Sequence, residues 1–178
     1  MARNQKTSSE VVYQNRWMSV REDKIIRSDG SQGIYGVVEK SDFVVIAAVD
    51  DNQIYLVEQF RYPVGKRFWE LPQGSWENSS VDPLFLAKAE LREETGLVAN
   101  SMVHVGHLFL AYGFSNQGYN VFFASDLQQL STRLEPEEQG LIVRPFPILD
   151  FEMMIGNGII KDATTIAAYS LLRIKGLL

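Results

Sequence analysis

The segment Ala89-Glu90-Leu91-Arg92-Glu93-Glu94-Thr95-Gly96-Leu97 decides how this chain of 178 residues is interpreted. In a helix each residue turns by about 100°, so Glu90, Glu93 and Glu94 fall within an arc of about 100°. An apolar stripe lies beside them, made of Leu84, Ala87 and Leu91. The pattern predicts a helix that buries this stripe and holds the carboxylates together along its margin.

The ends of the predicted helix are marked too. Asp82 and Pro83 have the order of an N-cap followed by proline at the first helical position. Gly96 suits the position just after the last turn.

The carboxylates are placed against two local rules. They sit in the last turns, where the helix dipole disfavours anions, and like charges at i,i+4 repel each other. Such a cluster indicates a compensating cation, and oxygen ligands without sulfur favour Mg²⁺ or Mn²⁺. The alternative is a solvated acidic face, partly neutralised by Arg92.

Strand patterns surround this helix on both sides. The runs Phe43 to Val49 and Ile54 to Phe60 predict two strands joined by a turn. Further elements are expected as strands over residues 103–110, 119–124 and 141–146, and as helices over 151–155 and 162–174. His104 and His107 lie three apart on one of these strands, so they should face opposite sides.

The order of elements predicts an α+β fold, an α-β-α sandwich with a mixed central sheet flanked by helices. Alternating segments from Val11 to Val38, broken by glycines, suggest a small β-hairpin layer ahead of it, and residues 1–10 suggest a frayed tail. We therefore expect residues 1–40 to form an N-terminal β-hairpin layer and residues 41–178 to form the main domain.

The segment at 89–97 resembles the second half of the signature of the Nudix hydrolase family, Arg-Glu-aliphatic-x-Glu-Glu-x-Gly-aliphatic. It is preceded by Trp69-Glu70-Leu71-Pro72-Gln73-Gly74, which is similar to the family's entry into its loop. Two signature positions differ, since the arginine is Ala89 and the loop glutamate is Val81. In the family these two residues support the loop, so their joint loss indicates a loop that packs differently around a retained metal site.

The resemblance implies a set of metal-binding residues. Glu90 and Glu94 correspond to direct ligands of Mg²⁺ (or Mn²⁺), Glu93 to a ligand that often acts through water, and Gln73 to a main-chain carbonyl ligand. The sequence has no cysteine, no Gly-x-Ser-x-Gly and no P-loop, so a metal-activated water is the economical nucleophile. Relatives carry a mobile catalytic glutamate in the acidic loop after residue 133, which makes Glu138, then Glu137, the candidate general base. A merely solvated acidic loop is the alternative.

The flanking segments resemble the ADP-ribose and nucleoside-diphosphate-sugar branch of the family, whose N-terminal layer commonly builds a homodimer. Arg61 matches a substrate-contacting arginine there, and its fork suits a diphosphate. Tyr35 and Trp17 are candidates for stacking on the base across the dimer interface, although both could be core residues. Tyr112 stands where ADP-ribose enzymes often carry proline, which leaves room for other nucleotide sugars.

Composition excludes several classes. Apolar residues make up 46% of the chain and charged residues 22%, as in a globular protein. No apolar run approaches the roughly 18–20 residues of a membrane span. A net charge of −5 argues against general nucleic-acid binding. The lack of cysteine and of a secretory signal suggests a cytoplasmic protein.

We therefore expect hydrolysis of a nucleoside diphosphate sugar such as ADP-ribose to a nucleoside monophosphate and a sugar phosphate. The alternatives are hydrolysis of nucleoside triphosphates, dinucleoside polyphosphates or RNA 5′ ends, and a catalytically silent Nudix-fold ligand sensor.

Overall fold

The computed structural model describes residues 4–75, 81–130 and 140–178. Within these ranges one sheet of seven strands forms the centre of the molecule, in the order β10-β5-β4-β9-β8, with β6 paired to β5 and β7 paired to β4. Its strands are β4 (Phe43–Asp50), β5 (Gln53–Arg61), β6 (Lys66–Glu70), β7 (Gln73–Gly74), β8 (Leu97–Phe109), β9 (Gly118–Gln129) and β10 (Ile142–Pro147). Because β4 runs parallel to β9 and the other pairs are antiparallel, the sheet is mixed as expected.

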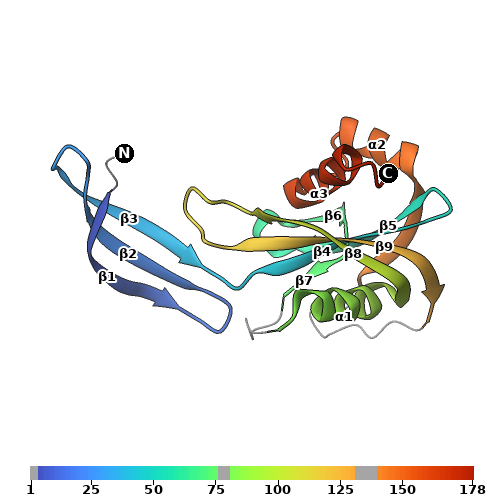
Figure 1. Cartoon of the computed structure of the whole chain (residues 1–178), viewed down its shortest axis with the longest axis horizontal. Helices are drawn as coiled ribbons and strands as arrows, with labels where there is room; N and C mark the ends of the chain where they lie inside the picture. Colours follow the sequence, from blue (N-terminus) through green and yellow to red (C-terminus); the bar gives the residue numbers. More distant parts are fainter. Residues whose placement is uncertain (1–3, 76–80, 131–139) are drawn as a thin grey trace.

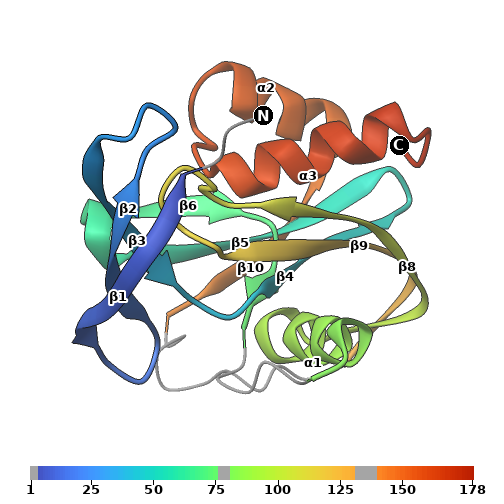
Figure 2. The ribbon, with the colours of Figure 1, turned by 60° about the vertical axis from the view of Figure 1, so that its left-hand side comes forward.

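Helices cover both faces of this sheet. The helix α1 (Pro83–Thr95) lies on one face, and α2 (Ile148–Gly156) and α3 (Ala163–Ile174) lie on the other (Figures 1 and 2). The central strand β4 explains the layering, since Val45 and Ala47 pack into the core beneath α2 and α3 while Val44, Ile46 and Ala48 pack into the core beneath α1. A strand buried on both faces is a continuous apolar run. The predicted α-β-α sandwich is confirmed.

The caps of α1 are those that the sequence predicts. Asp82 accepts hydrogen bonds from the backbone N–H groups of Leu84 (2.7 Å) and Phe85 (3.2 Å). Gly96 has φ 71°, a left-handed conformation that glycine adopts without strain, and its N–H donates to the carbonyl of Arg92.

The N-terminal residues form a second, antiparallel sheet of β1 (Gln5–Gln14), β2 (Ser19–Ile26) and β3 (Gln32–Glu39). This sheet extends away from the main body (Figure 1). The prediction of a frayed tail up to residue 10 is wrong, because β1 starts at Gln5 and pairs with β2 along its length. Polar side chains join the strands there: Ser9 donates to Asp23 and Thr7 to the carbonyl of Lys24.

A bulge in β8 overturns the prediction for the two histidines. The register slips between His104 and Gly106, so that His104 lies opposite Phe122 and His107 lies opposite Asn120 on β9. Because Asn120 and Phe122 are two apart, both histidines share one face. They have separate partners there: His104 contacts Asn120 at 3.0 Å and His107 contacts Asp42 at 2.8 Å.

None of the helices described is long and apolar enough to cross a membrane.

Candidate active site

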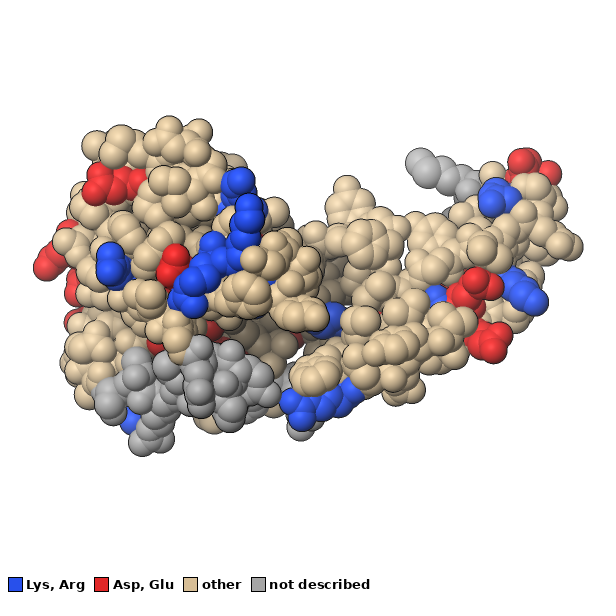
Figure 3. Space-filling model, turned by 180° about the vertical axis from the view of Figure 1, so that it is seen from behind, with Lys and Arg blue, Asp and Glu red and all other residues tan. Residues whose placement is uncertain are grey.

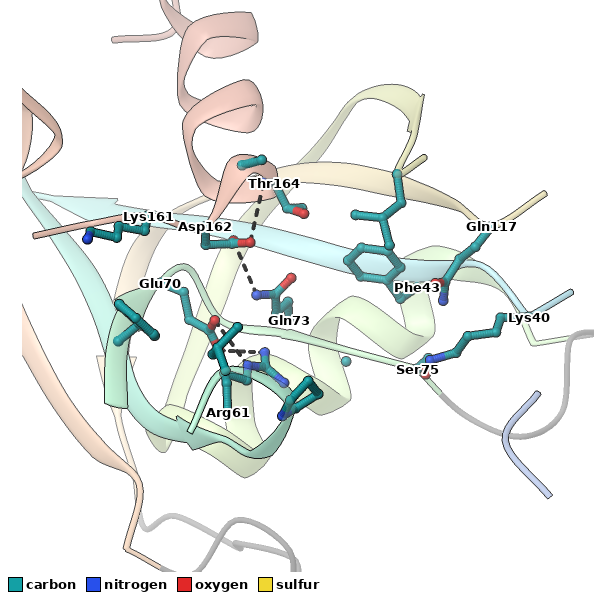
Figure 4. A pocket seen from close by; sticks show the side chains of 16 residues that line it. Lys40, Phe43, Arg61, Glu70, Gln73, Ser75, Gln117, Lys161, Asp162 and Thr164 are labelled. Carbon is teal, nitrogen blue, oxygen red and sulfur yellow. Dashed lines mark hydrogen bonds and ion pairs between the residues drawn. The ribbon is translucent and has the colours of Figure 1, made fainter. Parts of the chain in front are cut away.

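A cavity of about 760 Å³ opens at one end of the central sheet (Figure 4). It gathers residues from the start of β4, the end of β5, the strands β6 and β7, and the start of α3. The lining includes Lys40, Phe43, Arg61, Glu70, Gln73, Gly74, Gln117, Lys161, Asp162 and Thr164. Lys40, Arg61 and Lys161 bring positive charge to its wall, which suits an anionic ligand.

The short strand β7 separates this cavity from the glutamates of α1. The backbone N–H of Gln73 donates to Oε2 of Glu94 at 3.0 Å. A Cβ at Gly74 would collide with the carboxylate of Glu90, so only glycine permits this approach. Glu90 is 6% exposed and Glu94 2% exposed. Two buried carboxylates one helical turn apart are thus held directly behind β7.

This arrangement fits a hard divalent cation. Mg²⁺ is commonly bound by one or two carboxylates together with substrate phosphates, and it keeps several waters. The carboxylates of Glu90 and Glu94 provide oxygen ligands beside β7, whose residues Gln73 and Gly74 line the cavity. Within the described residues, no group of three or more His, Cys, Asp or Glu side chains is arranged to hold a metal ion.

Arg61 reaches the cavity from the end of β5 and forms an ion pair with Glu70 on β6 (Figure 4). Its Nε donates to Oε2 of Glu70 at 3.2 Å, and its Nη2 donates to Oε1. The Glu70 side chain is 3% exposed and the Arg61 side chain 41% exposed. Burial raises the pKa of the Glu70 carboxyl, and Arg61 opposes that rise.

The wall opposite Arg61 is built around Asp162, the N-cap of α3. Its Oδ2 accepts hydrogen bonds from the hydroxyl of Thr165 at 2.7 Å and from Nε2 of Gln73 at 3.4 Å. The same Thr165 hydroxyl accepts from the backbone N–H of Leu71 at 2.9 Å. These bonds tie the segment before β7 to α3. Burial first, and then the charge of Asp162, raise the pKa of the Tyr119 phenol, whose ring packs 5.1 Å from that of Phe43.

The structure does not bring all the predicted residues to this cavity. Glu93 is half-buried and lines a second cavity of about 400 Å³ between α1 and β8, together with Ala89 and Arg92. Glu137 and Glu138 lie outside the described residues.

The three aromatic candidates also lie away from the lining of the first cavity. Tyr35 donates its hydroxyl to the carbonyl of Gly113 at 2.7 Å, and so joins β3 to the loop after β8. Trp17 is 58% exposed, with the guanidinium of Arg16 over its ring, and Tyr112 is 84% exposed. Their proposed contact with the base remains a prediction.

Sequence reasoning gave no role to several residues of the wall. Glu70 was visible only as part of the loop entry, and Asp162 only as the start of a helix. Lys40 and Gln117 carry no local signal, and Phe43 was visible only as the start of a strand, because the pairing of β4 with β9 is what brings these segments together.

The space-filling view from behind shows a recess between the main body and the N-terminal sheet (Figure 3). Lys and Arg side chains gather on the part of the main body beside it, although the chain as a whole carries a net charge of −5. Local positive charge can concentrate anionic ligands despite an acidic total.

A mixed sheet between helices, with a glutamate-bearing helix behind a short glycine-containing strand, is the arrangement of a Nudix-type sandwich. Known proteins agree with this class. A family model described as "Nucleoside diphosphate sugar hydrolase N-terminal domain" matches residues 5–38. The crystal structure of an ADP compounds hydrolase superposes with a TM-score of 0.84 at 20% identity, covering 98% of this chain and 95% of that one, which shows the fold.

Two relatives in sequence are more specific. The ADP-ribose pyrophosphatase of Mycobacterium tuberculosis is 32% identical over 90% of this chain and 78% of its own length. The ADP-ribose pyrophosphatase of Bacillus subtilis is 30% identical over 74% of this chain and 71% of its own length. The chain therefore belongs to the Nudix hydrolase family, within its ADP-ribose pyrophosphatase branch.

Proposed function

We propose that the chain hydrolyses the pyrophosphate bond of ADP-ribose or a related nucleotide sugar, giving a nucleoside monophosphate and a sugar phosphate, with Mg²⁺ (or Mn²⁺) as cofactor. One observation carries the proposal. Arg61, whose planar fork suits a diphosphate, borders the same cavity as strand β7, which contacts the glutamates of α1. The names of the two relatives support the substrate class.

The proposal assigns a role to each side of the cavity. Glu90, Glu94 and the carbonyl of Gln73 would hold the metal, with Glu93 acting through water. When bound, the metal lowers the pKa of a water and stabilises charge on the phosphoryl oxygens. Arg61 orients the diphosphate through its planar fork.

The rest of the assignment completes the catalytic set. Phe43 supplies an apolar wall for the nucleoside or the sugar. Glu138 or Glu137 would take the proton from the attacking water, a role that requires a carboxylate within hydrogen-bond reach of it.

A product screen tests this assignment. The purified chain is incubated with Mg²⁺ and, separately, with ADP-ribose, other nucleotide sugars, nucleoside triphosphates, dinucleoside polyphosphates and capped RNA. Chromatography should show a nucleoside monophosphate and a sugar phosphate in equal amounts from a nucleotide sugar. Preferred cleavage of triphosphates or RNA ends would redirect the proposal, and binding without turnover of any compound would indicate a ligand sensor.

Gly74→Ala should lower kcat by about 10–100-fold, the usual size of a disturbed support around metal ligands. The new methyl group would displace the Glu90 carboxylate, which is the flexible end of a side chain, so the fold should survive. Circular dichroism and steady-state kinetics measure both effects. Gly156→Ala at the end of α2 is the matched control, because a Cβ there meets nothing within 4 Å. Equal kinetics for the two variants would contradict the assigned role of Gly74.

We further propose a cytoplasmic homodimer joined through the N-terminal sheet. Every residue of β1 is exposed, and apolar side chains face solvent on this sheet, including Val12 and Ile34, and at Trp17 in the turn between β1 and β2. Exposed apolar surface of this kind marks contact sites. Ile34→Asp should shift the mass measured by light scattering from dimer towards monomer, whereas Ile159→Asp, at an exposed site before α3, should not. A wild-type monomer at micromolar concentration would refute the dimer.

A further inference from the structure

Apart from Asp162, which caps α3, Glu70 is the carboxylate among the described residues that line the cavity, and it lies beside cations that suit an anionic ligand. It is 2% exposed. A buried carboxylate is costly unless it is paired and hydrogen-bonded. Its nearness to a diphosphate would also be repulsive unless its charge were already neutralised. The position therefore calls for an explanation other than direct contact with the ligand.

Both oxygens of Glu70 are engaged by β5. Oε2 accepts from Nε of Arg61 at 3.2 Å, while Oε1 accepts from Nη2 of Arg61 and from Nε2 of Gln59 at 2.7 Å. The ladder makes this possible, because Val57 lies opposite Glu70, and Gln59 and Arg61 follow at two-residue steps on the same face.

The contact with Glu70 uses the edge of the guanidinium formed by Nε and Nη2, and it does not use Nη1. Arginine has five N–H donors in a rigid plane. Glu70 takes one donor from Nε and one from Nη2, and no described residue accepts from Nη1. Arg61 is one of the residues that line the cavity, and its side chain is 41% exposed. A bidentate phosphate contact needs this plane held in one orientation.

We infer that Glu70 is a positioning residue that, supported by Gln59, holds the guanidinium of Arg61 in the orientation that binds the diphosphate. The inference rests on the proposed function and adds a residue pair to it. It predicts that Glu70 acts on substrate binding only through Arg61.

The test is a double-mutant cycle of Glu70→Gln and Arg61→Ala, measured as KM and kcat for the nucleotide sugar that the screen identifies. Glu70→Gln keeps the shape but replaces one acceptor oxygen by a donor that faces the guanidinium. KM should rise about tenfold or more, with kcat within about threefold of wild type. In the Arg61→Ala background the same change should alter KM by less than about twofold. Equal effects in both backgrounds, or an unchanged KM in the single variant, would overturn the inference.

A matched ion pair joins the same two strands outside the cavity. Arg67 on β6 contacts Glu58 on β5 at 3.1 Å, and neither residue lines the cavity. Glu58→Gln should therefore leave KM within about twofold of wild type. If Glu70→Gln does not fold, Gln59→Ala is the second variant. Gln59 is half-buried, and the substitution removes its hydrogen bond to the Glu70 carboxylate. KM should then rise when Gln59→Ala is made in the wild type but not when it is made in the Arg61→Ala background. Failure of that second cycle overturns the inference as well.

The acid side of the pH profile gives an independent readout. Arg61 from β5 and Asp162 from the start of α3 are the charged groups that act on Glu70. Burial raises the pKa of the Glu70 carboxyl above its ordinary 4.5, so Glu70 takes up a proton as the pH falls through that raised value. The ionic hold on Arg61 is then lost. KM of the wild type should rise there, and the KM profile of Glu70→Gln should lack this step.

Binding of ADP, measured by calorimetry, separates the proposed hydrolytic function from the positioning role of Glu70. If the wild type cleaves none of the screened compounds, the proposed function fails, yet weaker ADP binding by Glu70→Gln, absent from the Arg61→Ala background, still supports the positioning role. If the wild type cleaves a nucleotide sugar and the cycle shows no coupling, the function stands and the inference fails.

Discussion

Glu94→Gln and Glu90→Gln should each lower kcat by about 10²–10³-fold, the loss expected when one electrostatic stabiliser of a transition state is removed. Each substitution keeps the size of the side chain and removes its charge. At position 94 the amide oxygen can still accept the 3.0 Å bond from the Gln73 N–H, so β7 should stay in place. The loss should therefore lie in catalysis rather than in folding.

Thermal unfolding distinguishes a loss of metal binding from a loss of folding. Mg²⁺ that binds the native chain raises Tm, because a ligand of the folded state stabilises it. This rise should be present in wild type and absent or reduced in Glu90→Gln and Glu94→Gln. Glu93→Gln is the internal comparison, since Glu93 lines the second cavity, and its kcat should fall less. If kcat stayed within threefold of wild type in both variants, the glutamates of α1 would have no part in the reaction.

Arg61→Ala should raise KM for the nucleotide sugar by about 10–150-fold, the range that corresponds to losing a hydrogen bond to a charged group. It should also lower the free energy of unfolding by about 1–3 kcal/mol, because Glu70 is left buried without its cation. Chemical denaturation and kinetics measure the two effects on the same preparation.

Arg61→Lys sharpens this prediction. Lysine keeps the charge, but its compact ammonium cannot bridge Glu70 and a diphosphate as a planar fork does. It should recover part of the lost stability and little of the KM. Arg67→Ala on the neighbouring strand removes an exposed ion pair and should change KM by less than about twofold. Full recovery of KM by lysine would show that charge alone matters at position 61.

Local sequence patterns predicted the central strand β4 and the two ends of α1. The apolar run from Phe43 to Val49 predicted a buried strand, and it is the central strand β4. Asp82, Pro83 and Gly96 bound α1 because capping chemistry acts within a few residues.

Features that depend on pairing between distant strands could not be predicted in this way. The bulge after His104 follows from the register of β8 against β9, and it reverses the side to which later residues point. The first half of β1 is polar, so an apolar pattern does not predict a strand there. The strand forms because β2 supplies its hydrogen-bond partners.

The candidate site also has one part that local sequence patterns predicted and one part that they did not. Its acidic half lies on one helix and was predicted from spacing within a single segment. Its basic wall joins the start of β4, the end of β5 and the start of α3, so that Lys40 and Lys161 lie about 120 residues apart in the chain. The role inferred for Glu70 needed the geometry of β5 against β6, because the letters Trp69-Glu70-Leu71 do not reveal which cation a buried glutamate meets.

Binding of Mn²⁺, measured by the loss of the free-ion signal in electron paramagnetic resonance, is the decisive test of a metal site at Glu90 and Glu94. The experiment uses wild type, Glu90→Gln and Glu94→Gln, each with ADP present to supply phosphate oxygens. The wild type should bind Mn²⁺, and both variants should bind it at least about tenfold more weakly. Equal binding in all three proteins, or none in the wild type, would contradict a metal centre at the glutamates behind β7.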